Sequence, residues 1–289
     1  EFRSVSKLYP GADGAPVAAL RGCTLSVARG EFVMVVGPSG SGKSTLLVIA
    51  GGMLAPTEGE VLFGGADAYA MPASARAALR RSRVGFVFQS FNLIPYLSCV
   101  ENVALPALLE GKPHGESFQR AESLLQRLGL ASRLRHKPAE LSVGERQRTA
   151  ICRSLVNEPE VILADEPTGN LDPKMTEEVL DILGRLNSAG QTILMATHDL
   201  RRAERGTRIV ALEGGLVIED RKLRVAAGAY HQPPFYRELR RYDGTVNMDV
   251  KAQKSYQVVA GADFNFKGFD NRPFRLTTEA YYKSMSSVD

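Results

Sequence analysis

The most informative part of the sequence is Gly37-Pro38-Ser39-Gly40-Ser41-Gly42-Lys43-Ser44-Thr45. The apolar run from Phe32 to Val36 precedes it and predicts a short buried strand, and the run from Leu46 to Ile49 predicts the first turns of a helix. A loop of the form G-x-x-x-x-G-K-[ST] between a strand and a helix is typical of phosphate binding. A Gly- and Ser-rich connection without a ligand is the alternative, but every fixed position is filled. The sequence therefore predicts that the chain binds a nucleoside triphosphate.

The residue types in this loop fit that chemistry. Glycines let backbone N–H groups turn inward around a polyphosphate, and the N-terminus of the following helix adds partial positive charge. In such a loop Lys43 would reach the β- and γ-phosphates, and the Ser44 hydroxyl would hold Mg²⁺. The predicted ligands are thus the nucleotide and Mg²⁺.

Length and composition are those of an ordinary globular protein. The chain has 289 residues, enough for one large domain or two, with 44% apolar and 24% charged residues. The net charge of +4 is small and the basic residues are scattered, so no nucleic-acid partner is expected. Cys23, Cys99 and Cys152 have no metal-ligand spacing, which favours a reducing, cytosolic compartment. No apolar run approaches the ~18–20 residues that a membrane-spanning helix needs.

Polar residues follow several apolar strands. The strand predicted from Val161 ends in Asp165 and Glu166, and the strand from Thr192 to Ala196 leads to Thr197-His198-Asp199. Carboxylates at the end of a buried strand are costly unless they serve a cation or a reaction. A third strand, Val84 to Gln89, ends on a polar residue, and residues 91 to 156 read as mostly helical. This order predicts an α/β fold with its ligands at the strand ends.

Over roughly residues 1 to 222, the sequence closely resembles the nucleotide-binding domain of ABC transporters. The matching motifs occur in the family's order: GPSGSGKST (Walker A), VFQ ending at Gln89 (Q-loop), LSVGERQR at 141–148 (signature), VILADE (Walker B), GNLD at 169–172 (D-loop) and ATHD at 196–199 (switch histidine). The resemblance implies a P-loop NTPase of ABC type, with a mixed sheet core and a helical subdomain over about 91–156. It also implies ATP hydrolysis.

The family's roles carry over residue by residue. Tyr9 matches the aromatic residue that stacks on adenine, and the loop from Gly37 to Thr45 matches the phosphate cradle. The family's Mg²⁺ ligands correspond to Ser44, Gln89 and Asp165. The residue that acts on the attacking water corresponds to Glu166, and the residue that contacts the γ-phosphate corresponds to His198. Phosphoryl transfer depends mainly on positioning and charge neutralisation, which agrees with these assignments.

The signature stretch implies a dimer of two copies. In the family its serine and glycines touch the γ-phosphate of the ATP that the other subunit holds. Here Ser142, Gly144 and Glu145 match nucleotide-contacting positions. Val143 stands where the family has a second glycine and Glu145 where it has glutamine, so the contacts of residue 143 are open, but Ser142 and Gly144 are expected to suffice.

The resemblance also implies a membrane partner. The stretches GFVFQSFNLIPYLSCVENVALP and LADEPTGNLD are similar to ATPases of lipoprotein-release and macrolide-export type. The chain is therefore expected to lie peripherally on the cytoplasmic face of the inner membrane, driving a separate permease. The alternative is a non-transporting regulatory ATPase of the cell-division type.

The last part of the chain, residues 223–289, has a different pattern. Ser255 to Lys267 and Phe274 to Lys283 alternate apolar and polar residues around a predicted turn, and strands of ~10 residues with one apolar side are typical of membrane barrels. The tail resembles part of a TonB-dependent outer-membrane receptor, and a small soluble β-extension is the alternative. A cytosolic ATPase and an outer-membrane barrel cannot both work in one chain without export. We therefore interpret the tail as a β-hairpin-rich fusion or vestige; a receptor fragment in which only the tail functions is a further alternative.

Overall fold

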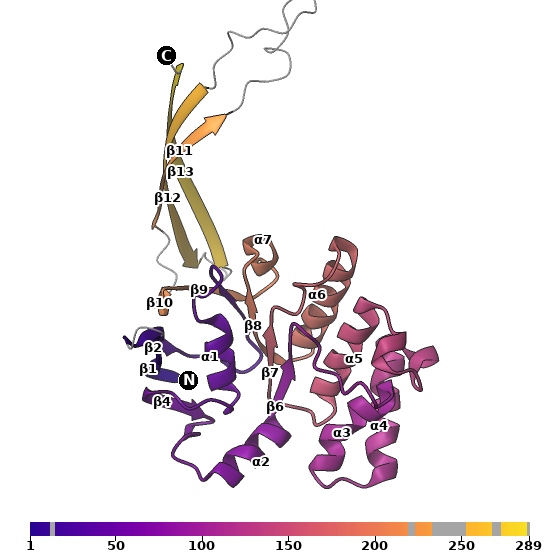
Figure 1. The fold of residues 1–289 in the computed structure, drawn as a ribbon. Coiled ribbons are helices and arrows are strands. Elements are labelled where there is room, and N and C mark those ends of the chain that lie inside the picture. Colours follow the sequence, from indigo (N-terminus) through magenta and orange to yellow (C-terminus); the bar gives the residue numbers. More distant parts are fainter. Residues whose placement is uncertain (12–14, 219–222, 233–252, 268–272, 288–289) are drawn as a thin grey trace, which may run out of the picture. The chain divides into compact units, whose positions relative to one another are not determined.

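The computed structural model describes residues 1–11, 15–218, 223–232, 253–267 and 273–287 (Figure 1). It divides into two compact units, Glu1–Glu219 and Asp220–Asp289. The boundary expected after residue 222 adjoins residues 219–222, which lie outside the described residues.

A six-stranded mixed sheet forms the centre of the first unit. Its strands, in spatial order, are β10 (Leu216–Ile218), β9 (Arg208–Glu213), β3 (Phe32–Val36), β8 (Thr192–Thr197), β7 (Val161–Asp165) and β6 (Val84–Val87). The strands from β9 to β6 pair in parallel, and β10 pairs antiparallel with β9. The predicted mixed sheet core is confirmed.

Strand β3 is apolar throughout because both of its faces are covered. Successive side chains of a strand point to opposite faces. Val33 and Val35 belong to one buried cluster, and Phe32, Met34 and Val36 belong to another. A strand buried on both sides in this way reads as a continuous apolar run.

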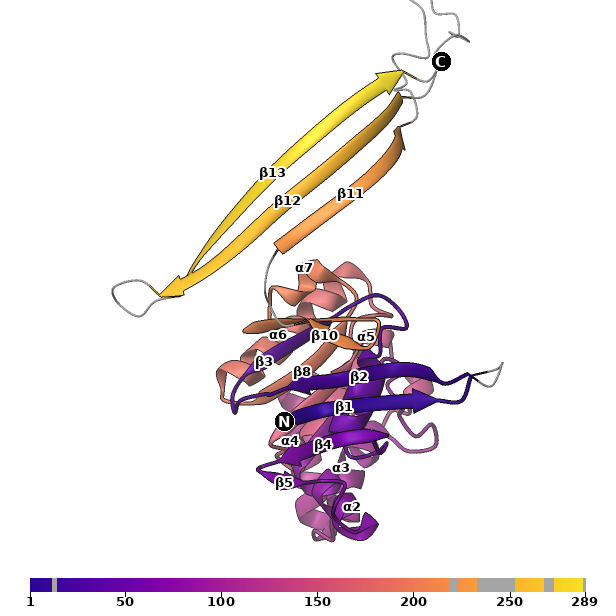
Figure 2. The same ribbon diagram turned by 90° about the vertical axis from the view of Figure 1, so that its left-hand side faces the viewer.

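One face of the mixed sheet is covered by helix α1 (Lys43–Ala50) and, beyond it, by a second sheet (Figure 2). The second sheet is antiparallel, in the order β2 (Val17–Leu25), β1 (Phe2–Tyr9), β4 (Glu58–Phe63) and β5 (Ala66–Asp67). Leu46, Leu47 and Ile49 of α1 share a buried cluster with residues of both sheets. This packing fixes α1, and with it the loop that precedes it.

Helices make up the rest of the unit: α2 (Ala73–Arg83), α3 (Cys99–Leu109), α4 (His114–Arg127), α5 (Val143–Leu155), α6 (Pro173–Ser188) and α7 (Leu200–Ala203), with short 3-10 turns at Ala131–Arg133 and Pro138–Glu140. α3, α4 and α5 share a buried cluster of their own, as the helical subdomain of the predicted fold requires. Two expectations need correction. Strand β6 ends at Val87, so Gln89 lies beyond it, and β7 ends at Asp165, because Glu166 has left the extended conformation with a φ of 47°.

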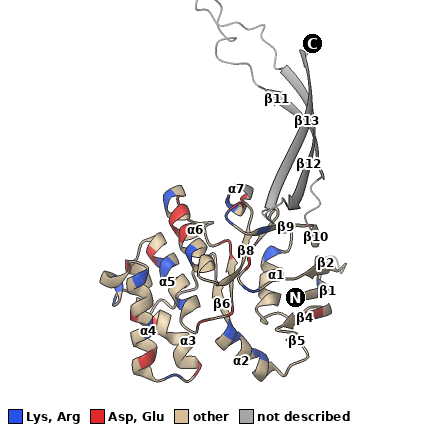
Figure 3. Cartoon of the chain, turned by 180° about the vertical axis from the view of Figure 1, so that it is seen from behind, with Lys and Arg blue, Asp and Glu red and all other residues tan. Residues whose placement is uncertain are grey.

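Helices α4, α5 and α6 carry charges of both signs (Figure 3). Helix α2 has four arginines and no acidic residue, but Arg80 donates to the Gly52 carbonyl and Arg83 pairs with Glu160. Cys23, Cys99 and Cys152 are free and buried. Within the described part of the chain, no helix combines the length and apolar character needed to cross a membrane.

The second unit is a three-stranded antiparallel sheet in the order β11 (Leu223–Gln232), β12 (Gln253–Lys267) and β13 (Pro273–Ser287). The register sets Phe264 opposite Leu276 and Tyr256 opposite Ser284. The two strands predicted from alternation are present as β12 and β13, and β11 was not predicted. The predicted turn between them, at residues 268–272, lies outside the described residues.

Candidate active site

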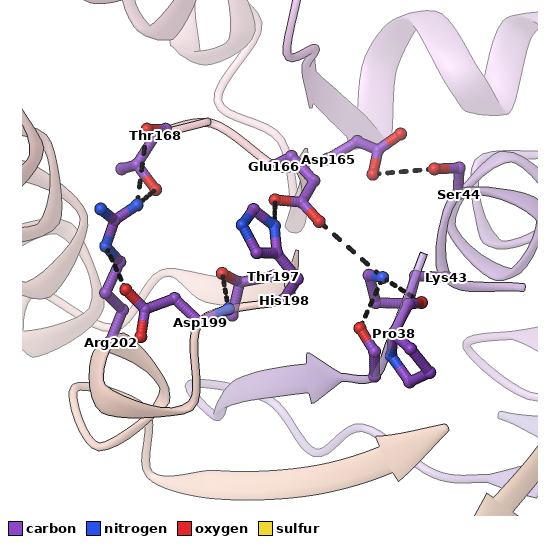
Figure 4. Close-up of polar contacts among 11 residues, drawn as sticks. Pro38, Lys43, Ser44, Asp165, Glu166, Thr168, Thr197, His198, Asp199 and Arg202 are labelled. Carbon is purple, nitrogen blue, oxygen red and sulfur yellow. Dashed lines mark hydrogen bonds and ion pairs between the residues drawn. The ribbon is translucent and has the colours of Figure 1, made fainter. Parts of the chain in front are cut away.

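The loop between β3 and α1 closes around the side chain of Lys43. Only 7% of Lys43 is exposed, and its Nζ donates to the carbonyls of Gly37 at 2.8 Å and Pro38 at 3.0 Å (Figure 4). Gly42 precedes the helix with a φ of 103°, and a Cβ on it would lie 2.2 Å from the Ala19 carbonyl oxygen. Only glycine fits there, since other residues meet both strain and a clash.

Ser44, at the start of α1, contacts the end of β7. Its Oγ donates to Asp165 Oδ1 at 3.1 Å. Burial raises the pKa of Asp165 above its ordinary value, and the nearby Glu166 carboxylate raises it further. A carboxylate in this environment gains from a cation, and hydroxyl and carboxylate oxygens are ligands that Mg²⁺ prefers. The donor set therefore fits Mg²⁺.

Glu166 lies between the loop lysine and the histidine at the end of β8. Its Oε1 is 3.8 Å from Lys43 Nζ, and its Oε2 is 2.6 Å from His198 Nδ1 (Figure 4). Its φ of 47° is unusual for a residue other than glycine, and such strain persists only where the surroundings over-determine the conformation. Three strand ends, those of β3, β7 and β8, thus bring together Lys43, Asp165, Glu166 and His198.

Among the described residues, Gln89 and Tyr9 lie outside the hydrogen bonds and ion pairs that join this group. Gln89 is exposed, and its Nε2 lies 2.9 Å from the point where a Cβ on Gly169 would be, while Asn170 donates to its carbonyl at 3.2 Å. It therefore lies beside the loop that follows Glu166. Tyr9 is 38% exposed at the end of β1, on the sheet whose strand β2 touches the phosphate loop through Ala19.

The signature residues form a second group, at the N-terminus of α5. Ser142 caps the helix by accepting from the Glu145 N–H at 3.2 Å. The Glu145 carboxylate accepts from the Ser142 N–H and from Arg133 Nε, each at 2.8 Å. The Arg133 hydrogen bond, followed by that of the Ser142 N–H, lowers the pKa of Glu145 to about 2. Glu145 thus has a structural partner that the sequence did not indicate.

Of the two remaining signature positions, Gly144 is closely surrounded and Val143 is not. A Cβ on Gly144 would meet Met175 Sδ at 2.5 Å, whereas Val143 is 37% exposed. In the part of the chain that the structure describes, no hydrogen bond or ion pair joins the signature group to the phosphate-loop group. The predicted site residues therefore form two separate groups within one chain.

One further residue adjoins the first group and was not predicted. Arg202 of α7 contacts Thr168, just beyond Glu166, and Asp199, next to His198 (Figure 4). Arginines are frequent on surface helices, and no pattern in the sequence distinguishes this one.

A cavity of about 410 Å³ lies elsewhere in the same unit. Its lining includes Val161 and Thr192, the first residues of β7 and β8. The phosphate loop follows the opposite ends of the parallel strands, so the cavity is not part of the candidate site.

Comparison with known proteins agrees with this geometry. The ABC transporter family model matches residues 20–169. An uncharacterized ABC transporter ATP-binding protein of Thermotoga maritima is 46% identical over 217 residues, covering 75% of this chain and 92% of the relative. The chain belongs to the ABC transporter family.

Other relatives of this ABC chain are longer. Macrolide export ATP-binding/permease protein MacB 1 of Aeromonas hydrophila is 50% identical over 206 residues, covering 71% of this chain and 32% of the relative. The chain spans about a third of that protein.

The dimeric structure of MJ0796, a bacterial ABC transporter cassette, superimposes with a TM-score of 0.70 at 41% identity, covering 75% of this chain and 95% of that one. MJ0796 is also known in a post-hydrolysis state bound to ADP and Pi. The first unit of our chain is an ABC-type ATPase cassette.

Proposed function

We propose that the chain is the ATP-binding and ATP-hydrolysing subunit of an ABC transport system and that it works as a pair of copies. One observation carries the proposal: Lys43, Ser44, Asp165, Glu166 and His198 meet at the ends of three neighbouring strands, linked by contacts of 2.6 to 3.8 Å. A cation, a pair of metal-type ligands and a base beside one polyphosphate loop are the parts that phosphoryl transfer to water requires.

ATP would bind with its phosphates in the loop from Gly37 to Thr45. The Lys43 ammonium, already held by loop carbonyls, would contact the β- and γ-phosphates. The carboxylate that pairs with Lys43 is that of Glu166, so a γ-phosphate would compete with Glu166 for the same cation. Tyr9 would stack on adenine from the end of β1.

Mg²⁺ would be held by Ser44, Gln89 and Asp165, and it would neutralise phosphate charge. Mg²⁺ is usually bound by one or two carboxylates together with substrate phosphates, which suits a site with the single carboxylate of Asp165. Glu166 would then orient the attacking water through Oε1, while His198, in contact with Oε2, would reach the γ-phosphate.

The signature group would act on the ATP of the second copy. Ser142 and Gly144, together with the N-terminal N–H groups of α5, form a site of partial positive charge. Their separation from the phosphate-loop group supports a role in trans, as does the dimeric relative. Glu145 would stabilise this end of the helix and would also contact the nucleotide.

The membrane partner is inferred from relatives whose names join ATP-binding and permease functions, in macrolide and pyoverdine export. We infer a lipoprotein-release or macrolide-export type system, with this chain peripheral on the cytoplasmic face of the inner membrane and a separate permease. A regulatory ATPase of the cell-division type is the second candidate. Co-purification with a permease supports the first.

For the second unit we infer an origin by fusion. The sequence pattern of its strands resembles that of an outer-membrane receptor, and the ATPase assignment does not depend on this resemblance.

Two substitutions test the proposed function. Lys43→Ala should abolish tight Mg-ATP binding in a titration, while the exposed Lys174→Ala should not.

Glu166→Gln should keep ATP binding, lower turnover ~10²–10⁴-fold and yield an ATP-bound dimer on size-exclusion chromatography. The matched control is the exposed Glu122→Gln. Near-parental turnover by Glu166→Gln contradicts the assignment.

A further inference from the structure

A side-chain bridge joins the two turns that carry Glu166 and His198. Arg202 Nη1 donates to Thr168 Oγ1 at 3.0 Å and lies 3.5 Å from the Thr168 carbonyl oxygen. Arg202 Nε lies 3.0 Å from Asp199 Oδ2 (Figure 4). One guanidinium therefore contacts both turns.

Each end of the bridge is close to a reacting group. Thr168 is two residues after Glu166, and Asp199 directly follows His198. Thr168 is only 2% exposed, so its hydroxyl has little access to water. The Asp199 N–H in turn donates to Thr197 Oγ1 at 3.1 Å, which ties that turn to the end of β8. The planar guanidinium presents its donors in a fixed fork, so it sets a distance as well as a charge.

We propose that Arg202 is a positioning residue of the ATPase, which fixes the Glu166 carboxylate relative to the His198 imidazole without touching nucleotide. The assignment rests on the proposed roles of Glu166 and His198. Glu166 has a strained backbone, with a φ of 47°, and therefore needs support from its surroundings. Because hydrolysis depends on placing a water between base and γ-phosphate, a displacement of ~1 Å is enough to slow it strongly.

A purely structural role is the competing explanation, because Arg202 of the short helix α7 also forms an i,i+3 pair with Asp199, which directly precedes that helix. The substitution Arg202→Lys distinguishes the positioning role from the purely structural one. A lysine keeps charge for Asp199, but one ammonium lacks the fork that reaches Thr168 as well. Thr168→Val removes the hydroxyl and leaves the Arg202–Asp199 pair in place.

The experiment measures steady-state ATP hydrolysis by the full chain carrying Arg202→Met, Arg202→Lys or Thr168→Val. The matched control is Arg205→Met, because Arg205 pairs with Glu177 and Asp181 of α6. We expect kcat to fall about tenfold in Arg202→Met and in Arg202→Lys, and less in Thr168→Val, with KM for ATP changed less than about twofold. Arg205→Met should retain the parental kcat.

A spectroscopic readout reports the geometry directly. In nucleotide-free protein, the ¹⁵N resonance of His198 Nδ1, assigned with His198→Gln, should shift in Arg202→Met because the contact with Glu166 Oε2 changes. It should stay in place in Arg205→Met. If Arg202→Met does not fold, the kcat of Thr168→Val decides.

Two results would overturn the assignment: a kcat of Arg202→Met equal to that of Arg205→Met with an unshifted His198 resonance, or full activity of both Arg202→Lys and Thr168→Val. The proposed function fails in a different way, when Glu166→Gln and His198→Ala themselves leave hydrolysis unchanged. Low activity of those two variants beside an unaffected Arg202→Met rejects the role of Arg202 alone.

Discussion

At the scale of single residues, two glycines of the phosphate loop allow the cost of backbone strain to be distinguished from the cost of a steric clash. Gly40 and Gly42 both have positive φ, of 78° and 103°. A Cβ on Gly40 would meet nothing within 4 Å, whereas one on Gly42 would lie 2.2 Å from the Ala19 carbonyl oxygen.

Gly40→Ala should therefore lower the free energy of unfolding by only about 1–2 kcal/mol, the cost of a left-handed alanine. Gly42→Ala should cost clearly more, about 3 kcal/mol or above, because strand β2 must also move. Denaturant unfolding of both variants measures the difference. Equal losses would show that β2 yields to the added methyl group.

Glu145 makes stability depend on pH. Its pKa falls from the ordinary 4.5 to about 2 in the folded chain, mainly through Arg133. A lowered pKa means that the carboxylate stabilises the fold above about 4.5 and that this contribution disappears as the pH falls toward 2.

Glu145→Gln should thus lower the free energy of unfolding by about 1–2 kcal/mol at pH 7, and by progressively less in acid. The check is chemical denaturation between neutral pH and pH ~3, with the exposed Glu122→Gln as the control. If the difference in the free energy of unfolding between the parent and Glu145→Gln stays constant with pH, the predicted contribution from the titration of Glu145 is ruled out.

At the scale of elements, helix α5 holds the turn that follows Gln89. Phe91 and Asn92 both have positive φ, of 62° and 48°. Their carbonyls accept from the guanidinium of Arg153, at 2.7 Å in the case of Phe91, and Arg146 lies 5.5 Å from the Phe91 ring centroid. Burial lowers the pKa of Arg153, and in the described part of the chain no carboxylate pairs with it. Its hydrogen bonds therefore go to this turn.

Arg153→Met keeps an unbranched apolar stem and removes the guanidinium donors, so the turn should relax. We expect faster amide exchange over residues 89–94 and a loss of about 1–3 kcal/mol in the free energy of unfolding. Hydrogen exchange read by mass spectrometry tests this, with the exposed Arg81→Met as the matched control. Unchanged exchange in the turn would mean that Phe91 and Asn92 hold their conformation unaided.

The sequence predicted the elements with strong local signals. β3 is found where its apolar run lies, and the phosphate loop follows it, because a strand buried on both faces and a glycine loop leave clear patterns. α6 was missed, although Asp172 caps it and Pro173 begins it. The contacts made by Arg133, Arg153 and Arg202 were also missed. Each joins segments distant in the chain or serves a turn, and such contacts follow from packing rather than from local pattern.

At the scale of the whole molecule, every residue assigned to ATP lies in the unit Glu1–Glu219. The second unit has a sheet of its own, in which β12 pairs with both β11 and β13. A small sheet whose strands alternate apolar and polar residues is an aggregation hazard.

Truncation after Lys222 should therefore leave ATP binding and basal hydrolysis intact and should improve solubility. The control ends after Thr207 and removes β9, whose residues 208–211 pair with residues 33–36 of β3. That shorter chain should lose cooperative unfolding, because the strand that feeds the phosphate loop loses a neighbour. The measurements are ATP titration, turnover and the soluble fraction of each chain against the full length. If the chain ending at Lys222 unfolds or stops hydrolysing ATP while the full chain continues, residues 223–289 support the ATPase as an accessory domain, and their interpretation as a fused tail is wrong.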